Sequence, residues 1–322
     1  MDQIASIKKL PQGWRLEPID SERSRIVFEG DHGQAHLVYY ALFSGIMLAS
    51  IELTTPQLDM IPVSQTDMMS VNYCLRGRCE CDVGDMGSVI VQDGNLCFSA
   101  NMARRFSYPT SHYVGFEYWI GFSELDASTN ALLESLGAGP RAVCGNLCAS
   151  TPAFTLHPEG ELEALCQAIC RELDAPEADV GALRMLTLQL LRAAGGIGPE
   201  MRIDTAAYLK RSQRDIAHAV FEAIEVSENG RVDIDAMTKS FGLSAASLRS
   251  YFSRVYGTTP AAFARTRALR HAAELLETTQ RSVSDIATVV GYANPSKFSA
   301  AFRKEIGVTP LEYRRRSRFD TS

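Results

Sequence analysis

The feature that most constrains this chain is a helix–turn–helix pattern in residues 281–316. Apolar residues recur there at the spacing of one helical face: Val283, Ile286, Ala287 and Val290. Gly291 interrupts this helix, Asn294 can cap the next one, and Pro295 suits a first helical turn because its missing N–H would be unbonded there. The second helix ends at Gly307. In a helix–turn–helix, the second helix is the one that enters the major groove of DNA.

The same pattern occurs a second time upstream. Three positions are repeated at an offset of 49 residues: Ile234 and Val283, Met237 and Ile286, Gly242 and Gly291. Five more are repeated at an offset of 50: Ser244 and Asn294, Leu248 and Phe298, Phe252 and Phe302, Gly257 and Gly307, Pro260 and Pro310. Matches in two registers predict an internal duplication with one residue added in the second turn.

These residues resemble the DNA-binding domain of the AraC/XylS family of transcription regulators. The resemblance runs from about Ser212 to Arg316. The second unit carries most of the family signature: Ile286-Ala287, Gly291-Tyr292, Phe298, Phe302, Gly307, Thr309-Pro310 and Tyr313-Arg314. The resemblance implies an all-α DNA-binding domain over residues 205–322, with double-stranded DNA at a promoter or operator as its partner.

The distribution of charge agrees with one DNA-binding domain. The whole chain has a formal net charge of −6, with 32 Lys+Arg and 38 Asp+Glu. From Thr205 onward, however, there are 18 basic and 12 acidic residues, so the excess of acidic residues lies entirely before Thr205. A basic part joined to an acidic part is expected when only one of them meets phosphate.

The segment between about His36 and Phe122 is rich in strand signals. Val71, Tyr73 and Leu75 alternate with polar residues, and Gly-containing turns follow at short intervals. Many short strands predict a small barrel or a double-sheet roll. AraC-type modules often follow a cupin-like sensor domain. The expected fold class is therefore α+β, with a cupin-like sensor and dimerisation domain in residues 1–200 (barrel about 36–122, helices about 126–194).

Two amphipathic helices are predicted before the domain boundary. Their apolar faces are Leu162, Leu165, Cys166 and Ile169 in the first, and Leu183, Leu186, Leu190 and Leu191 in the second. In the AraC family such helices commonly form a dimer surface, which implies a homodimer. Packing on the chain's own barrel is the equally weighted alternative, because periodicity does not say what covers an apolar face. The next helix is expected from Ala206 to Glu228, and another from Pro260 to Thr278 joins the two units.

The outward faces of the second helices, together with the basic residues beside them, hold the candidate DNA contacts. These are Ala246, Arg249, Ser250, Arg254, Asn294, Ser296, Lys297, Ala300, Arg303, Lys304 and Arg314. Arg249 is the best candidate base reader, since a guanidinium can pair with guanine O6 and N7; a phosphate or solvent contact is the alternative. Arg254, Arg303, Lys304 and Arg314–Arg316 are better assigned to phosphate, with a solvated face as the alternative.

Two positions depart from the family. An Arg is common where this chain has Ser250 and Ala300. Both second helices are therefore rich in small residues. We expect modest base readout, with thymine methyl contacts and DNA shape contributing more.

The N-terminal part offers no recognised metal or catalytic set. Cupin enzymes use a closely spaced His pair, and His32, His36 and His112 do not reproduce it. A metal-free pocket for a small effector, lined by Tyr73, Phe116 and Tyr118, is the simpler hypothesis, with plain core as the alternative. The eight cysteines include pairs, Cys79/Cys81, Cys144/Cys148 and Cys166/Cys170, that could sense metal or redox state; small buried thiols are the favoured interpretation.

Together these features predict a sequence-specific transcription regulator of the AraC type. It is expected to respond to a small-molecule effector, to need no cofactor and to perform no catalysis. RNA polymerase is a further candidate partner. Without a run of about 18 apolar residues or the apolar core of a signal peptide, we expect a cytoplasmic protein with no membrane contact. Two alternatives stay open: a cupin-type enzyme with an accessory DNA-binding domain, and a constitutive DNA-binding protein with a structural N-terminal half.

Overall fold

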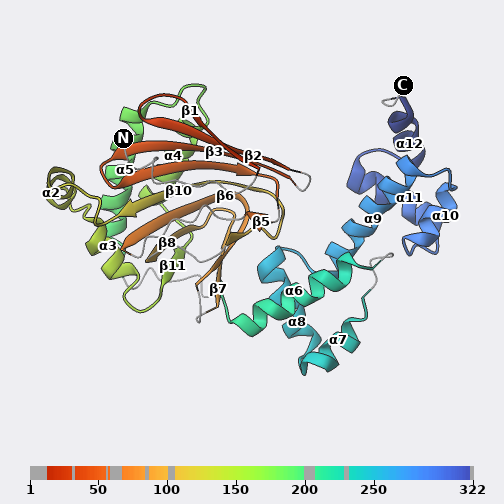
Figure 1. Ribbon diagram of the computed structural model, residues 1–322. Helices are drawn as coiled ribbons and strands as arrows, with labels where there is room; N and C mark the ends of the chain where they lie inside the picture. Colours follow the sequence, from red (N-terminus) through yellow and green to blue (C-terminus); the bar gives the residue numbers. More distant parts are fainter. Residues whose placement is uncertain are drawn as a thin grey trace. The chain divides into compact units, whose positions relative to one another are not determined.

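The computed structural model describes residues 13–30, 33–55, 57–58, 67–83, 87–100, 106–198, 207–227 and 232–319. The chain divides into two compact units, Met1–Arg211 and Ser212–Ser322 (Figure 1). The first is built on a large antiparallel sheet with helices, and the second is helical. The α+β class is thus confirmed. Among the described helices, none combines the length and the apolarity that crossing a membrane would require.

The larger part of the sheet is an antiparallel array of six strands. In spatial order they are β1 (Trp14–Pro18), β2 (Arg23–Gly30), β3 (Gly33–Phe43), β4 (Ile46–Leu53), β10 (Tyr113–Gly121) and β6 (Met68–Asp82). The first half of β6 also pairs with β8 (Leu96–Ala100), which in turn pairs with β11 (Ala153–Leu156). The strands β1 and β2 lie before His36, so the sheet begins earlier than the sequence indicated.

The second half of β6 belongs to a further set of strands. It pairs with β7 (Ser88–Gln92) and β9 (Phe106–Ser107), while β5 (Gln57–Leu58) pairs with β9 and β12 (Tyr208–Leu209) with β7. Among the described strands the order β1-β2-β3-β4-β10-β6-β7-β12 is an open path, so the expected closed barrel is not confirmed.

The change of partners along β6 occurs at Gly77. Its φ of +100° lies in the region that favours glycine, and a Cβ built there would stand 2.1 Å from the carbonyl oxygen of His112. The Gly77 amide donates to Oδ1 of Asp93 at 2.6 Å. Only glycine lets the neighbouring backbone approach this closely, and the approach allows one long strand to serve both sets of partners.

Four helices are described alongside the sheet in the first unit. They are α2 (Ala127–Ser135), α3 (Pro140–Leu147), α4 (Glu161–Leu173) and α5 (Val180–Gly195). The predicted apolar stripes of α4 and α5 are largely buried, and they share one hydrophobic cluster with the sheet residues Val71, Phe98 and Ile120. These stripes therefore cover the chain's own sheet, and they are not free surfaces for a second copy.

The opposite face of the sheet is also buried. A second hydrophobic cluster joins Leu37, Ile51 and Tyr113 of the larger array to Cys79 and Val89 of the other strands. This interior lies between the two sets of strands. We call it the inner face of the sheet, and the face under α4 and α5 the outer face.

The second unit holds seven described helices. They are α6 (Arg211–Glu225), α7 (Ile234–Phe241), α8 (Ala245–Tyr256), α9 (Pro260–Thr278), α10 (Val283–Val289), α11 (Pro295–Ile306) and α12 (Pro310–Phe319). The helix expected from Ala206 starts only at Arg211, because Tyr208 and Leu209 instead pair with β7. The predicted joining helix is confirmed with the bounds Pro260–Thr278.

Candidate nucleic-acid interface

The first helix–turn–helix is formed by α7 and α8. Ser244 caps α8 by accepting from the amide of Ser247 at 3.0 Å. Gly242 and Gly257 end the two helices in the left-handed conformation, with φ of +63° and +71°. These local signals fix where α8 begins and ends, and hence which of its residues can turn outward.

Aromatic packing holds α8 against α6 and α9. Phe252 is fully buried, and its ring lies 4.6 Å from that of Tyr256 and 5.7 Å from that of Phe263. The Tyr256 ring in turn stacks on Phe221 of α6 at 4.7 Å. With Leu248 and Phe252 inward, Ala246, Arg249 and Ser250 are left exposed on the other side of the helix.

The second helix–turn–helix, α10 and α11, repeats this construction. Ser282 and Asp285 form a reciprocal capping box at the start of α10. Asn294 caps α11, Gly307 ends it with φ of +89°, and the rings of Phe298 and Phe302 are fully buried. The candidate contacts Ser296, Lys297, Ala300, Arg303 and Lys304 are all exposed on this helix, as are Pro295 and Glu305. The duplication in sequence is therefore a duplication in structure.

The structure changes what Asn294 can contribute. Its Oδ1 accepts from the amides of Ser296 at 2.8 Å and Lys297 at 3.2 Å. The carbonyl side of the amide is thus taken by the helix cap, so only the Nδ2 donor can be offered to a base or a phosphate.

Arg314 has a bracing role that sequence reasoning missed. Its Nε donates to the carbonyl of Leu276 at 3.3 Å, and Nη2 donates to the carbonyl of Arg281 at 2.6 Å. The neighbouring Tyr313 hydroxyl donates to Glu277 at 2.6 Å. Arg314 therefore satisfies one carbonyl in the last turn of α9 and one in the segment that follows it, and ties α12 to both; any phosphate contact would use its remaining N–H groups.

The other candidate phosphate contacts differ in exposure. Arg303 and Lys304 are exposed in the last turn of α11. Arg254 is half-buried in the last turn of α8 and already interacts within the protein. Two exposed cations of α9, Arg265 and Arg270, were not singled out from the sequence, because a charged residue on a joining helix carries no motif of its own.

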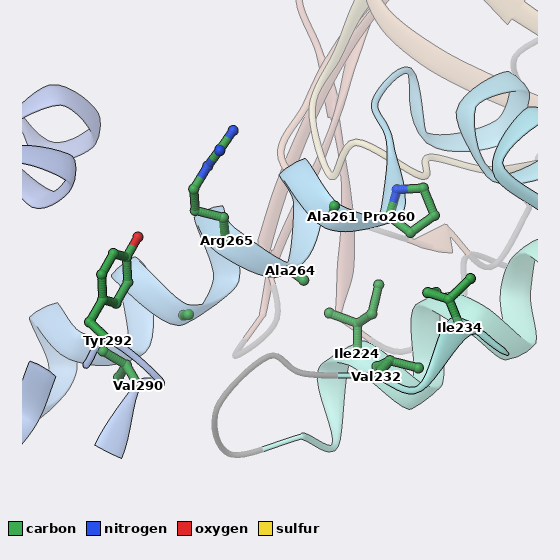
Figure 2. Close-up of a pocket in the computed structure, with 10 residues that line it drawn as sticks. Ile224, Val232, Ile234, Pro260, Ala261, Ala264, Arg265, Val290 and Tyr292 are labelled. Atoms are coloured by element: carbon green, nitrogen blue, oxygen red, sulfur yellow. The ribbon is translucent and has the colours of Figure 1, made fainter. Parts of the chain in front are cut away.

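A groove of about 460 Å³ lies between the two helix–turn–helix units (Figure 2). Ile224, Val232 and Ile234 line one side, and Ala261 and Ala264 of α9 line the other. Arg265, Val290 and Tyr292 complete its far end. The lining is mainly apolar, so this groove is distinct in character from the exposed faces of α8 and α11.

The three residues expected to line an effector pocket lie in the outer-face core. Tyr73 and Phe116 face each other across the β6–β10 ladder with ring centroids 5.3 Å apart, and Phe116 packs edge-on against Tyr118. All three are buried, and Thr187 of α5 donates to the Tyr118 hydroxyl at 3.1 Å. Burial raises the pKa of Tyr73 to about 12. They fill the space beneath the helices.

The cysteines are free thiols, and six of the eight are buried. Burial raises the pKa of Cys166 to about 12 and that of Cys170 to about 11, which makes both poor thiolates. The Sγ atoms of Cys79 and Cys81 are 3.8 Å apart. Within the described part of the chain, no three His, Cys, Asp or Glu side chains are grouped to hold a metal ion.

Comparison with known proteins agrees with this geometry. Residues 237–316 match a family model described as a helix-turn-helix domain. Regulatory protein SoxS of Salmonella typhimurium is 35% identical over 105 residues, which are 33% of this chain and 98% of SoxS. The lactose operon transcription activator of Staphylococcus xylosus is 31% identical over 100 residues, 31% of this chain and 36% of that protein.

A solved structure is also similar to part of this chain. It is described as a probable AraC family transcriptional regulator from Rhodopseudomonas palustris CGA009, with 30% identity, a TM-score of 0.30, and coverage of 32% of this chain and 97% of that one. The two capped helix pairs and the sequence matches define a helix–turn–helix DNA-binding protein. This chain belongs to the AraC family of transcription regulators.

Proposed function

We propose that this protein is a sequence-specific regulator that binds duplex DNA through both α8 and α11. The observation that carries the proposal is the equivalence of these two helices. Each has 12 residues, an N-cap side chain, a left-handed Gly at its end and an exposed face opposite two buried core residues. Such a face is what a recognition helix presents to the major groove.

The exposed residues divide by chemistry into base readers and phosphate contacts. Arg249 is the proposed base reader, because its fork can make two hydrogen bonds to guanine. The smaller proposed base-side contacts are Ala246, Ser250, Asn294, Ser296, Lys297 and Ala300. Arg254, Arg303 and Lys304 are the proposed phosphate contacts, which set affinity rather than sequence preference. Arg314 supports this surface by holding α12 to the end of α9.

The N-terminal unit is proposed to sense a small molecule and pass the signal to the DNA-binding unit. The long β6, which pairs with two sets of strands, supports a cupin-like double-sheet roll. Because the stripes of α4 and α5 are used internally, a homodimer would use other surfaces, such as the 60% exposed Met185. We further propose a cytoplasmic protein without catalytic activity that contacts RNA polymerase at its promoters.

Selection from a random duplex library tests the proposal. The full chain should enrich one consensus, and footprinting on that consensus should protect two segments about one helical turn apart. Arg249→Ala should flatten the consensus at one or two positions, whereas Arg211→Ala, outside both recognition helices, should leave it unchanged. Enrichment of no consensus, or a consensus unaffected by Arg249→Ala, would contradict sequence-specific reading by α8.

A further inference from the structure

Buried polar atoms gather on the inner face of the sheet. Among the described residues, four buried side-chain atoms lack a hydrogen-bond partner: Tyr39 Oη, Glu117 Oε1, Trp119 Nε1 and Thr155 Oγ1. Their residues are between 0% and 7% exposed. Burying such a group without a partner is unfavourable, because the group loses its hydrogen bonds to water and gains none, so four in one region call for an explanation.

The strand register explains why they lie together. Residues directly opposite each other on neighbouring strands point to the same face. One such row crosses six strands: Tyr39, Ala49, Glu117, Asn72, Cys97 and Thr155. Trp119 lies two residues beyond Glu117 on β10 and therefore on the same face. Ala49 is the small residue between Tyr39 and Glu117, and the Tyr39 ring reaches over it to within 5.3 Å of the Trp119 ring.

Glu117 is the acidic member of this group, and among the described residues no basic side chain is paired with it. Burial raises the pKa of Glu117 to about 7, while the nearby Trp119 and Ser70 side chains act in the opposite direction. A second buried glutamate, Glu80 of β6, is one residue out of phase with the inward-facing Cys79 and Cys81, and it accepts from the hydroxyls of Ser88 and Ser107. Within the part of the chain that the structure describes, an ionised Glu117 therefore lacks a counter-charge.

We infer that Tyr39, Glu117 and Trp119 form the recognition site for a small organic cation, a protonated amine or quaternary ammonium, on the inner face of the sheet. The carboxylate supplies the counter-charge, and the two aromatic rings supply faces that attract a cation. This inference rests on the proposed effector response and gives that effector its chemical class. It places the site on the opposite face of the sheet from Tyr73, Phe116 and Tyr118.

Trp119 gives the site its own reporter. The chain has two tryptophans, so the Trp14→Phe variant of the full-length protein leaves Trp119 as the sole indole. At pH 8, titration with tetramethylammonium or n-butylamine should change Trp119 emission saturably. The neutral counterparts, tert-butanol and n-butanol, should bind at least tenfold more weakly. Glu117→Gln should weaken cation binding at least tenfold, while Glu52→Gln, at an exposed position of β4, should leave it unchanged.

The pH dependence of the unsubstituted site provides a second measurement if Glu117→Gln does not fold. A permanent cation binds the ionised carboxyl, so its affinity should rise about tenfold per pH unit below pH 7 and level off above it. The other titratable side chains that face this interior are Tyr39, Tyr108, Tyr113, Cys79, Cys81 and Cys97. Burial raises the pKa of Tyr39, Tyr108 and Cys79, which keeps these three neutral in this range.

Three results would overturn the inference: no saturable response to either cation, equal binding of the neutral counterparts, or an affinity independent of both pH and Glu117. The proposed function is tested separately by DNA binding. If a neutral compound raises the thermal stability of the wild-type protein and of Glu117→Gln equally, the protein does respond to an effector, but the proposal of a cation site is wrong.

Discussion

The spacing of the two recognition helices makes a strong prediction about the DNA site. Both belong to one unit, and α9 joins them as one continuous helix of 19 residues. At about 1.5 Å per residue, it spans roughly 28 Å, close to the ~34 Å between successive major-groove faces on one side of B-DNA. A single chain should therefore read two adjacent major-groove segments, and its site should be non-palindromic because α8 and α11 differ in sequence.

Inserting base pairs between the two segments tests this geometry. Five added base pairs turn the second segment by about half of a ~10-bp turn and move it away by roughly 17 Å. The helix cannot stretch, because Leu269, Ala272 and Leu276 bury its face in the core of the second helix–turn–helix unit. Since each lost base contact costs about 1–3 kcal/mol, losing two or three contacts of one unit should weaken specific binding by at least ~30-fold.

The assay is a competition gel shift with the selected site, the five-base-pair insertion and a ten-base-pair insertion. The ten-base-pair insertion returns the segment to the same side but places it a full turn further away, so a rigid α9 should not restore binding. Recovery with ten base pairs would indicate two units on a flexible connection. Unchanged binding with five base pairs would show that one unit reads bases and the other is a scaffold, which the small residues Ser296 and Ala300 would then explain.

Four further outcomes are expected. The isolated C-terminal unit should fold and bind duplex DNA at low salt, since it has its own buried core; an unfolded circular dichroism spectrum would contradict this. Arg249→Ala should reduce the specificity ratio by ~1–3 kcal/mol, whereas Lys304→Ala should weaken binding to all sequences and lower the salt slope by about 1; identical behaviour would refute the division into base and phosphate contacts. Arg314→Ala should destabilise the unit by about 1–3 kcal/mol in urea because two backbone carbonyls lose a charged donor, while Arg315→Ala, at an exposed position, should have little effect. Burial holds the pKa of Glu117 near 7, against an ordinary value of 4.5, so between these pH values the folded state keeps a proton that the unfolded state loses. The free energy of unfolding should therefore fall by roughly 3 kcal/mol as the pH rises from 4.5 through 7. Glu117→Gln should remove this pH dependence.

Sequence reasoning was most accurate where local signals define structure. The bounds of α9 and the starts of α11 and α12 at Pro295 and Pro310 follow from cap residues, Pro at the first turn and Gly at the end. It was least accurate where pairing with distant strands decides. The strands β1 and β2 lack a distinctive local pattern, and Tyr208 and Leu209 have helix-compatible surroundings in sequence yet form β12 with β7.

The candidate site residues were likewise predicted well where local periodicity decides and poorly where packing between distant segments decides. Periodicity correctly placed Leu248, Phe252, Phe298 and Phe302 inward and the proposed DNA contacts Arg249 and Lys304 outward. It could not reveal that Arg314 donates to carbonyls of residues 33 and 38 positions earlier, because that contact depends on how α12 packs on α9.

By itself the sequence determined the helices of the second unit. Their N-cap residues, buried apolar faces and terminal glycines are local signals, each acting within one or two helical turns, and the whole pattern occurs twice. Only the tertiary structure decided what the apolar faces of α4 and α5 cover and which buried polar groups meet. Tyr39, Glu117 and Trp119 come from strands about 80 residues apart in the chain. Their common face is set by strand register, and no local pattern carries register, since shifting a strand by one residue would send each side chain to the other side of the sheet.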